Sequence, residues 1–197
     1  MDHDLRLEGY AFTLRPVQLE DAAFIVDLRT SDPQRVRYLH AVPRDAELQR
    51  QWLARYFERA GDYYWVLERR HGHGEPEGLV GIYDLDPDRR CAVWGRWVLR
   101  PGSLAAPECA LLIYRAAFEL LQLDMVYSLT AADNVRVLSF HESCGLQRGE
   151  TLPNYFDLDS GPQHAVKHIC TKESWPAIRE RLAEQAQRIA ARIAPPK

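Results

Sequence analysis

The stretch Trp94–Leu121, WGRWVLRPGSLAAPECALLIYRAAFELL, limits the possible folds of this chain more than any other. Its first part is rich in aromatic and β-branched residues, which predicts a strand that ends at the turn RPGS, residues 100–103. From Pro107 to Leu121 apolar residues recur at helical spacing, and proline suits the first turn of a helix. A strand that leads through a small-residue loop into a helix directs free backbone N–H groups to the positive end of the helix dipole. The sequence therefore predicts a phosphate site at this loop.

The loop alone does not identify its ligand. Neither the P-loop pattern G-x-x-x-x-G-K-[ST] nor the dinucleotide pattern G-x-G-x-x-G occurs in the chain. Many strand–loop–helix joints bind nothing, so the ligand has to be inferred from the rest of the sequence.

Length and composition predict one soluble globular domain. The 197 residues suffice for a core, and the hydrophobic fraction of 46% with a charged fraction of 27% is ordinary for such a domain. A net charge of −3 argues against a general nucleic-acid binder, which is usually basic. No apolar run reaches membrane-spanning length, and the N-terminal segment lacks the hydrophobic region of a signal peptide. We therefore expect a cytoplasmic protein without nucleic-acid or membrane partners.

The cysteines and histidines predict no metal site. The four cysteines, at 91, 109, 144 and 170, include no C-x-x-C pair and have no histidine nearby at ligand spacing. We interpret them as small buried residues of a reduced protein. The loop His71–Gly74 holds two histidines without a third ligand, which is typical of a solvated hairpin tip.

Strand and helix patterns alternate along the rest of the chain. A helix begins near Glu20, a second follows Asp45 as its cap, and Val135–Cys144 forms a third that stops at Gly145. Strands are expected at Phe12–Arg15, Tyr63–Glu68, Gly78–Asp84, Met125–Thr130, Tyr155–Phe156 and Ala165–Thr171.

The tail differs in character, since after Ser174 an apolar stripe runs among charged residues. We predict a domain over residues 1–172 and an amphipathic helix over 173–197. This helix packs on its own domain or forms a contact in a homodimer.

Four segments, in this order, resemble the GNAT superfamily of acetyl-CoA-dependent N-acetyltransferases, and the resemblance extends over about residues 12–172. LRPVQLEDAAFIVDLR (14–29) and GLVGIYDL (78–85) resemble the first strand and helix and the third strand of the branch that includes ribosomal-protein N-terminal acetyltransferases. RPGSLA (100–105) resembles the family's Q/R-x-x-G-x-G/A pyrophosphate loop. NVRVLSFHESCGL (134–146) resembles a segment in which Gly-Phe follows Asn by eleven residues.

The resemblance implies an α/β (α+β) fold, with a central mixed, mostly antiparallel sheet of six to seven strands, four flanking helices and the C-terminal helix. It also implies acetyl-CoA as co-substrate, with its pyrophosphate on the N–H groups of residues 100–105 and its pantetheine arm along the preceding strand. A backbone N–H of that strand is the expected oxyanion donor. The expected cofactor contacts are Trp97, Val98, Leu99, Arg100, Gly102, Ser103, Leu104, Ala105 and Asn134.

Three positions depart from the family pattern. Ser103 stands where a glycine is usual, and it still offers its N–H if the backbone angles there are not restricted to glycine. Leu146 replaces the usual Phe. His141, seven residues after Asn134, stands where many relatives carry a Tyr near the CoA sulfur. With a reference pKa near ~6.5, His141 is a candidate general acid; the alternative is that it only packs against the CoA chain or a core hydroxyl.

The general base is less well defined, because the strand before the loop has no carboxylate where relatives often place a Glu. Asp84 is the nearest candidate in sequence, and Asp86 and His40 are weaker ones. In the alternative, Asp84 is a solvated turn residue and a bound water accepts the proton.

The acceptor is predicted from three segments that resemble acetyltransferases of amino-sugar nucleotides more than ribosomal ones: residues 28–42, LRTSDPQRVRYLHAV, 49–68, QRQWLARYFERAGDYYWVLE, and 93–97, VWGRW. Arg29, Arg37 and Tyr38 are expected to contact sugar hydroxyls or a nucleotide diphosphate, and Trp94 or Trp97 to stack on a base or sugar. Alternatively, the arginines are surface charges and both tryptophans belong to the core.

The predicted function is acetyl transfer to the primary amine of a small molecule, a nucleotide-linked amino sugar, by direct attack in a ternary complex. One alternative is N-terminal acetylation of a protein. Another is a GNAT module that binds acyl-CoA without catalysis, which the absent Glu and Tyr favour.

Overall fold

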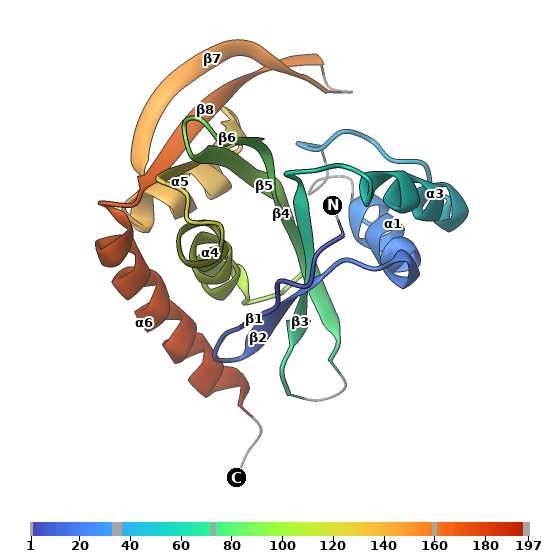
Figure 1. Ribbon diagram of the computed structural model, residues 1–197, viewed down its shortest axis with the longest axis horizontal. Coiled ribbons are helices and arrows are strands. Elements are labelled where there is room, and N and C mark those ends of the chain that lie inside the picture. Colours follow the sequence, from blue (N-terminus) through green and yellow to red (C-terminus); the bar gives the residue numbers. More distant parts are fainter. Residues whose placement is uncertain (1, 33–36, 72–73, 159–160, 195–197) are drawn as a thin grey trace.

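A computed structural model describes residues 2–32, 37–71, 74–158 and 161–194. It shows one eight-stranded sheet with helices on both faces (Figure 1). The strand order is β1-β2-β3-β4-β5-β6-β8-β7, and every neighbouring pair is antiparallel except β5 and β6. The predicted α/β fold with a mixed, mostly antiparallel sheet is confirmed, with one strand more than expected.

The strands are β1 Leu7–Glu8, β2 Phe12–Pro16, β3 Tyr63–Arg69, β4 Pro76–Asp86, β5 Cys91–Leu99, β6 Met125–Ala131, β7 Gln147–Leu158 and β8 Gly161–Thr171. The helices are η1 Leu19–Asp21, α1 Ala22–Thr30, α3 Ala46–Tyr56, α4 Ala106–Arg115, the π-helical turn η2 Ala116–Leu120, α5 Val135–Ser143 and α6 Trp175–Ile193. The short β1 was not expected, and β7 is much longer than the predicted Tyr155–Phe156. Residues 72–73 of the predicted hairpin tip lie outside the described residues.

Alternating residues of β3 fill a separate core on each face of the sheet. Trp65 and Leu67 pack beneath α4 and α6, whereas Tyr64 and Val66 pack beneath α1 and α3. Because both faces are covered, β3 is apolar and buried from Tyr63 to Leu67 rather than alternating. In the described part of the chain, no helix combines the length and apolarity that a membrane span needs.

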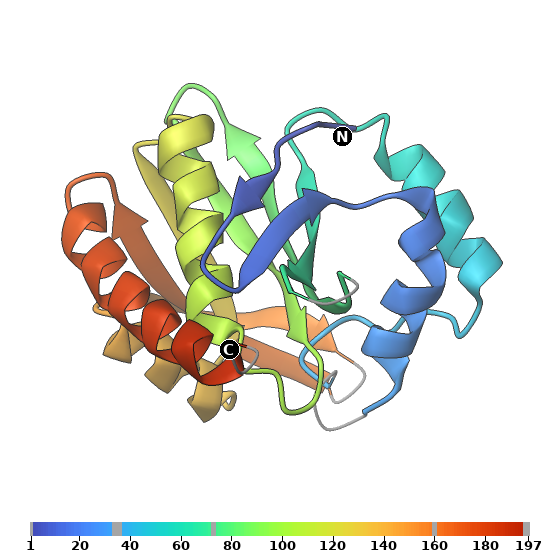
Figure 2. The same cartoon turned by 90° about the horizontal axis from the view of Figure 1, so that it is seen from below.

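Helix α4 is buried on nearly every side because it lies between the sheet and α6 (Figure 2). Its regular turns end earlier than the predicted Leu121, and the Leu121 N–H donates to the Ala116 carbonyl at 2.9 Å, five residues back. The widened turn carries Phe118, whose ring stacks on Trp175 of α6 at 5.6 Å. The tail helix is thus attached to the domain through an aromatic contact.

A buried carboxylate connects α4 to the turn between β1 and β2. The backbone N–H groups of Ala11 and Phe12 donate to Glu108 Oε1 at 2.9 and 3.0 Å, and Glu108 is fully buried. Burial raises the pKa of Glu108, and the backbone donors oppose that shift. Gly9 faces the same carboxylate, because a Cβ at Gly9 would lie 2.1 Å from Oε1.

The two parallel strands pair over a short length only. Cys91–Val93 of β5 pair with Met125–Tyr127 of β6, and beyond these residues the strands separate. On its other edge β5 has a bulge, because Leu79 and Gly81 of β4 pair with Val98 and Gly95. Arg96 within the bulge has a left-handed φ of 52°. The bulge bends β5 locally, on the strand that must diverge from β6.

Candidate active site

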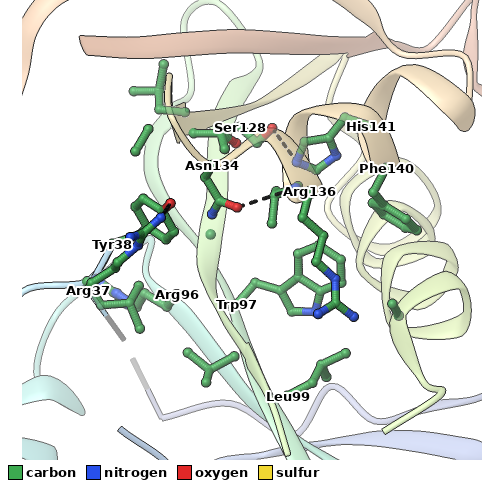
Figure 3. A pocket seen from close by; sticks show the side chains of 18 of the residues that line it. Arg37, Tyr38, Arg96, Trp97, Leu99, Ser128, Asn134, Arg136, Phe140 and His141 are labelled. Carbon is green, nitrogen blue, oxygen red and sulfur yellow. Dashed lines mark hydrogen bonds between the residues drawn. The ribbon is translucent and has the colours of Figure 1, made fainter. Parts of the chain in front are cut away.

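A cleft of about 590 Å³ opens where β5 and β6 separate (Figure 3). Its walls are residues 94–99 of β5 with Arg100 directly after them, residues 128–131 at the end of β6 and residues 134–137 at the start of α5. Phe140 and His141 of α5 also line it. Because β5 and β6 no longer pair here, backbone groups along their facing edges are free to bind an extended ligand.

The loop 100–105 has the backbone of an anion site. Gly102 has a left-handed φ of 76°, whereas Ser103 is not left-handed, so a serine is compatible with this position. The Ser103 N–H donates to the Arg100 carbonyl at 3.1 Å, and the Ser103 Oγ accepts from Ala105 N at 3.2 Å. Within the described ranges, the N–H groups of Gly102 and Leu104 have no partner. They lie just before α4, whose dipole favours an anion, so the loop fits a pyrophosphate.

Most of the predicted cofactor contacts face the cleft. Those that line it are Trp97, Val98, Leu99, Arg100, Ser103 and Asn134. Gly102, Leu104 and Ala105 belong to the adjoining loop without lining the cleft, and Ala105 is buried. Asn134 also caps α5, since its side-chain oxygen accepts from Val137 N at 3.4 Å.

His141 lies at the inner end of the cleft and is 1% exposed. Its Nε2 is 3.3 Å from Ser128 Oγ, as Figure 3 shows, and its ring packs edge-on against Trp94. Burial, with a smaller contribution from His168, lowers the pKa of His141 to about 3. The expectation that His141 keeps a pKa near its reference value is therefore corrected, because the buried imidazole is neutral at physiological pH. As in the alternative reading, it contacts a core hydroxyl.

Asp84, the predicted base, is exposed and lies at a second bulge of β4, with a φ of 52°. It is absent from the described residues that line the cleft or the neighbouring cavity. The structure therefore does not bring Asp84 and His141 together around one cavity.

A second cavity of about 900 Å³ adjoins the cleft, and Gly95, Arg96 and Val98 of β5 line both. Its aromatic lining residues are Tyr38, Trp52, Tyr64, Tyr83, Tyr155 and Phe156. Arg29, Arg55 and Arg96 also line it, and no Asp or Glu occurs among the described lining residues. The lining of this cavity, called the basic cavity below, is therefore cationic and aromatic.

The arginine of the bulge is neutralised within the protein. Arg96 makes a two-pronged ion pair with Asp62, at 2.5 and 2.8 Å, and its guanidinium lies 4.5 Å from the centre of the Tyr83 ring. Arg96 is thus held in one orientation at the boundary between the two cavities.

The predicted acceptor residues divide between the cavities. Arg29 lines the basic cavity, Arg37 lines the cleft, and Tyr38 lines both. Tyr38 Oη donates to the Asp133 carbonyl at 3.3 Å, which holds this segment beside the start of α5. Trp94 is in the core, only 1% exposed, with its indole N–H on Tyr114 Oη at 3.1 Å, although it borders the cleft.

Apart from Tyr38, the aromatic residues of the basic cavity were not predicted as site residues. Trp52 belongs to a helical stripe with Leu48 and Tyr56, which is also the pattern of a core-facing helix. Tyr83 lies in the segment 78–85 that resembles the family, but no site role was assigned to it, and Tyr155 lies on a strand that carries no motif. Only the pairing of β4 with β5, and the length of β7, place them near Arg29.

The profile of the acetyltransferase (GNAT) domain matches residues 11–147, well over half of the chain. The chain belongs to the GNAT acetyltransferase family. A search of curated proteins found no match. Solved structures of this family match it over most of both chains.

One similar structure is apo FdhC, described as a nucleotide-linked sugar GNAT, with 26% identity over 93% of this chain and 99% of that chain, and a TM-score of 0.76. Another is a protein described as an acetyltransferase of T. thermophilus, with 27% identity, coverage of 98% and 100%, and a TM-score of 0.76. A spermidine N-acetyltransferase variant from Vibrio cholerae shares 17% identity over 85% and 97% of the chains, with a TM-score of 0.73, and shows the common fold alone.

This GNAT acetyltransferase is therefore an N-acetyltransferase of the kind that uses acetyl-CoA, and the cleft with its phosphate-type loop fits that co-substrate. The four cysteines are free and buried, as predicted, and burial raises the pKa values of Cys109, Cys144 and Cys170. Among the described residues no group of three metal-binding side chains occurs.

Proposed function

We propose that this GNAT acetyltransferase transfers an acetyl group from acetyl-CoA to the primary amine of a nucleotide-linked amino sugar, by direct attack in a ternary complex. The observation that carries the proposal is the basic cavity, which adjoins the cleft at the bulge of β5. Its cationic and aromatic lining suits a bulky, anionic acceptor that contains a flat ring. A polyamine or a basic peptide would instead favour a lining with carboxylates. The similarity to a nucleotide-linked sugar GNAT points to the same acceptor class.

In this proposal the two substrates occupy different cavities. The loop 100–105 holds the pyrophosphate of acetyl-CoA, and the free edge of β5 from Trp97 to Leu99 holds its pantetheine arm. Acetyl-CoA supplies the thioester, whose C–S bond breaks as the new C–N bond forms. The N–H groups of the β5 bulge, at Arg96 and Trp97, are the candidate oxyanion donors at the boundary between the cavities.

Ser128 is the hydroxyl that we assign to protonating the leaving sulfur. It follows Tyr127, the last residue of β6 that pairs with β5, and therefore stands at the inner end of the cleft. In the tautomer that the step requires, neutral His141 carries its proton on Nε2, donates to Ser128 Oγ and leaves the hydroxyl proton of the serine free for the sulfur. Ser128 gives its proton to the sulfur and regains one from water, which also receives the proton that the amine loses. His141 then acts as a positioning residue rather than as the acid itself.

No side-chain base is required by this arrangement. Asp84 does not line either cavity, and the amine of an amino sugar is less basic than a lysine amine because of its electron-withdrawing neighbours. A water in the basic cavity therefore suffices to accept the proton.

The proposal is tested by following free-thiol release from acetyl-CoA with three acceptor sets side by side. These are nucleotide-linked amino sugars, short peptides with free N-termini, and polyamines. Turnover with the amino sugars alone would support the proposal. Turnover with peptides alone would establish N-terminal acetylation instead. If protein that binds acetyl-CoA released no thiol with any of the three acceptor sets, the result would favour a non-catalytic acyl-CoA-binding module.

A further inference from the structure

Among the residues that the structure describes, Arg29 has no anionic partner. Its Nη2 donates to the His40 carbonyl at 2.7 Å, and its buried Nε has no hydrogen-bond partner in the described parts of the protein. Burial lowers the pKa of Arg29, and the nearby positive charge of Arg96 lowers it further. An arginine stays protonated even so, which leaves a desolvated positive charge in the wall of the cavity.

The other interior arginines of this region are compensated. Arg96 is paired with Asp62, and Arg15 lies between Asp21 and Glu68 at 2.7 and 2.5 Å. Arg55, the third cation of the basic cavity, is exposed to solvent. Over the described residues, Arg29 is thus the one largely buried arginine of the cavity lining without an ion pair.

A desolvated charge destabilises a fold unless something compensates it. Arg29 lies in the last turn of α1, where the helix dipole favours a cation, but this effect is small beside the cost of desolvation. No acidic side chain among the described residues of the lining supplies the missing charge. An anionic ligand in the cavity would supply it.

We propose that Arg29 is the anchor for the diphosphate of the acceptor nucleotide, bound in the basic cavity. This inference rests on the proposed function, because it assigns the charged part of that acceptor. Trp52, Tyr83 and Tyr155 line the same cavity and provide an aromatic wall for the nucleotide base. The amino sugar then extends toward Gly95 and Arg96, where the cavity adjoins the cleft.

The proposal gives the protein two anion sites, which bind the phosphates of two different substrates. The loop 100–105 meets the phosphates of CoA at the cleft, and Arg29 meets the acceptor phosphates in the basic cavity. CoA and a nucleoside diphosphate should therefore bind to the protein together, without competing for one site.

Calorimetric titration of UDP and of inorganic pyrophosphate into protein saturated with CoA tests this site. The variants are Arg29→Gln and Arg29→Met, with Arg50→Gln as the charge-matched control, because Arg50 is exposed on α3 and lines neither cavity. We expect wild type and Arg50→Gln to bind UDP alike and the Arg29 variants to bind at least 10-fold more weakly. CoA affinity should be unchanged throughout, and pyrophosphate should show the same dependence on Arg29.

Thermal unfolding tests whether the loss of UDP binding in the Arg29 variants is due to misfolding. Because Arg29→Met removes a desolvated, unpaired charge, its Tm in the absence of ligand should equal or exceed that of wild type. UDP should raise the Tm of wild type and not that of Arg29→Met. Equal UDP affinity in wild type and both Arg29 variants would overturn the anchor. UDP that competes with CoA, and binds only to CoA-free protein, would also overturn it.

These outcomes separate the anchor from the proposed function. Turnover of amino-sugar nucleotides with UDP binding independent of Arg29 would refute the anchor alone. Arg29-dependent UDP binding without turnover of any amino-sugar nucleotide would refute the proposed acceptor and support the anion site. In an active enzyme, Arg29→Gln should raise the KM for the acceptor at least 10-fold and leave the KM for acetyl-CoA unchanged.

Discussion

The Nε2 of His141 lies 3.3 Å from the Oγ of Ser128. Ser128 directly follows the last residue of β6 that pairs with β5. One side chain comes from the last turn of α5 and the other from β6, and both are nearly fully buried. An imidazole that is neutral at physiological pH beside a hydroxyl orients that hydroxyl without adding a charge. This arrangement has direct consequences for the kinetics.

Replacing Ser128 with Ala should lower kcat by about 100-fold, because a positioned proton donor contributes roughly that much or more. The Kd of acetyl-CoA should stay within about twofold, since the loop 100–105 is untouched. Steady-state kinetics measures the change in kcat, and calorimetry measures the Kd of acetyl-CoA. Ser139→Ala, an equivalent change at an exposed site of α5, is the control and should retain full activity. Wild-type turnover in Ser128→Ala would remove the serine from the proton path.

The buried His141 should make stability depend on pH. Folded His141 stays neutral down to a pKa of about 3, whereas in the unfolded chain it gains a proton near pH ~6.5. Between these values the unfolded state binds more protons, so the free energy of unfolding falls as the pH falls through this window. The maximal slope is about 1.4 kcal/mol per pH unit.

Urea unfolding of wild type and His141→Gln at pH 7 and pH 5 measures this effect. On acidification from pH 7 to pH 5, the free energy of unfolding of wild type should fall by about 2 kcal/mol more than that of the variant. His168, whose pKa is also lowered by burial, leaves some pH dependence in the variant. Parallel pH curves for the two proteins would show that His141 is not held neutral.

Gly102→Ala should weaken CoA binding several-fold. The φ of 76° at Gly102 costs a residue with a Cβ about 1 kcal/mol, although the Cβ would meet nothing within 4 Å. Relief of that strain would rotate the N–H groups of the loop away from the anion. Gly74→Ala is the matched control, since Gly74 has a φ of 69° and equally open surroundings but lies outside the loop 100–105. Calorimetry with CoA should show a loss for the first variant and none for the second.

Gly9→Ala should destabilise the protein by about 2 kcal/mol, because its Cβ would collide with the Glu108 carboxylate. Glu108→Ala should also destabilise it, since two buried N–H groups lose their acceptor. The double variant should be less destabilised than the sum of the two, as the collision is absent without the carboxylate. Denaturant unfolding of the four proteins gives the coupling. Simple additivity would mean that Gly9 and Glu108 do not meet.

Local patterns predicted the elements of this fold well. Asp45 caps α3 as expected, with its carboxylate accepting from the N–H groups of Glu47 and Leu48. Gly145 has the left-handed φ of 89° that a glycine after a helix provides. The phosphate-type loop lies between β5 and α4, as its composition indicated. Each of these features depends on residues that are neighbours in the sequence.

The site required information that no local pattern contains. The pKa of His141 depends on its burial against Trp94 of β5 and His168 of β8, which are distant in the sequence and which only the fold brings together. Ser128 carries no motif and becomes a site candidate only because strand pairing stops one residue before it. The charge imbalance at Arg29 is visible only once Arg96 is seen to be paired with Asp62. The neutral state of His141, the separation of β5 from β6 and the missing counter-charge of Arg29 all depend on contacts between distant parts of the chain.

The three residue pairs that join β5 to β6 also have a mechanical meaning. They connect a five-stranded half of the sheet, β1 to β5, to a three-stranded half, β6 to β8. With so few pairs, a small rotation about this junction would change the width of the whole opening. An extended pantetheine arm that forms hydrogen bonds to the edges of both β5 and β6 would bridge the two halves of the sheet. Backbone amide exchange along Trp97–Leu99 should slow when it binds, and the sheet should then stiffen as one unit.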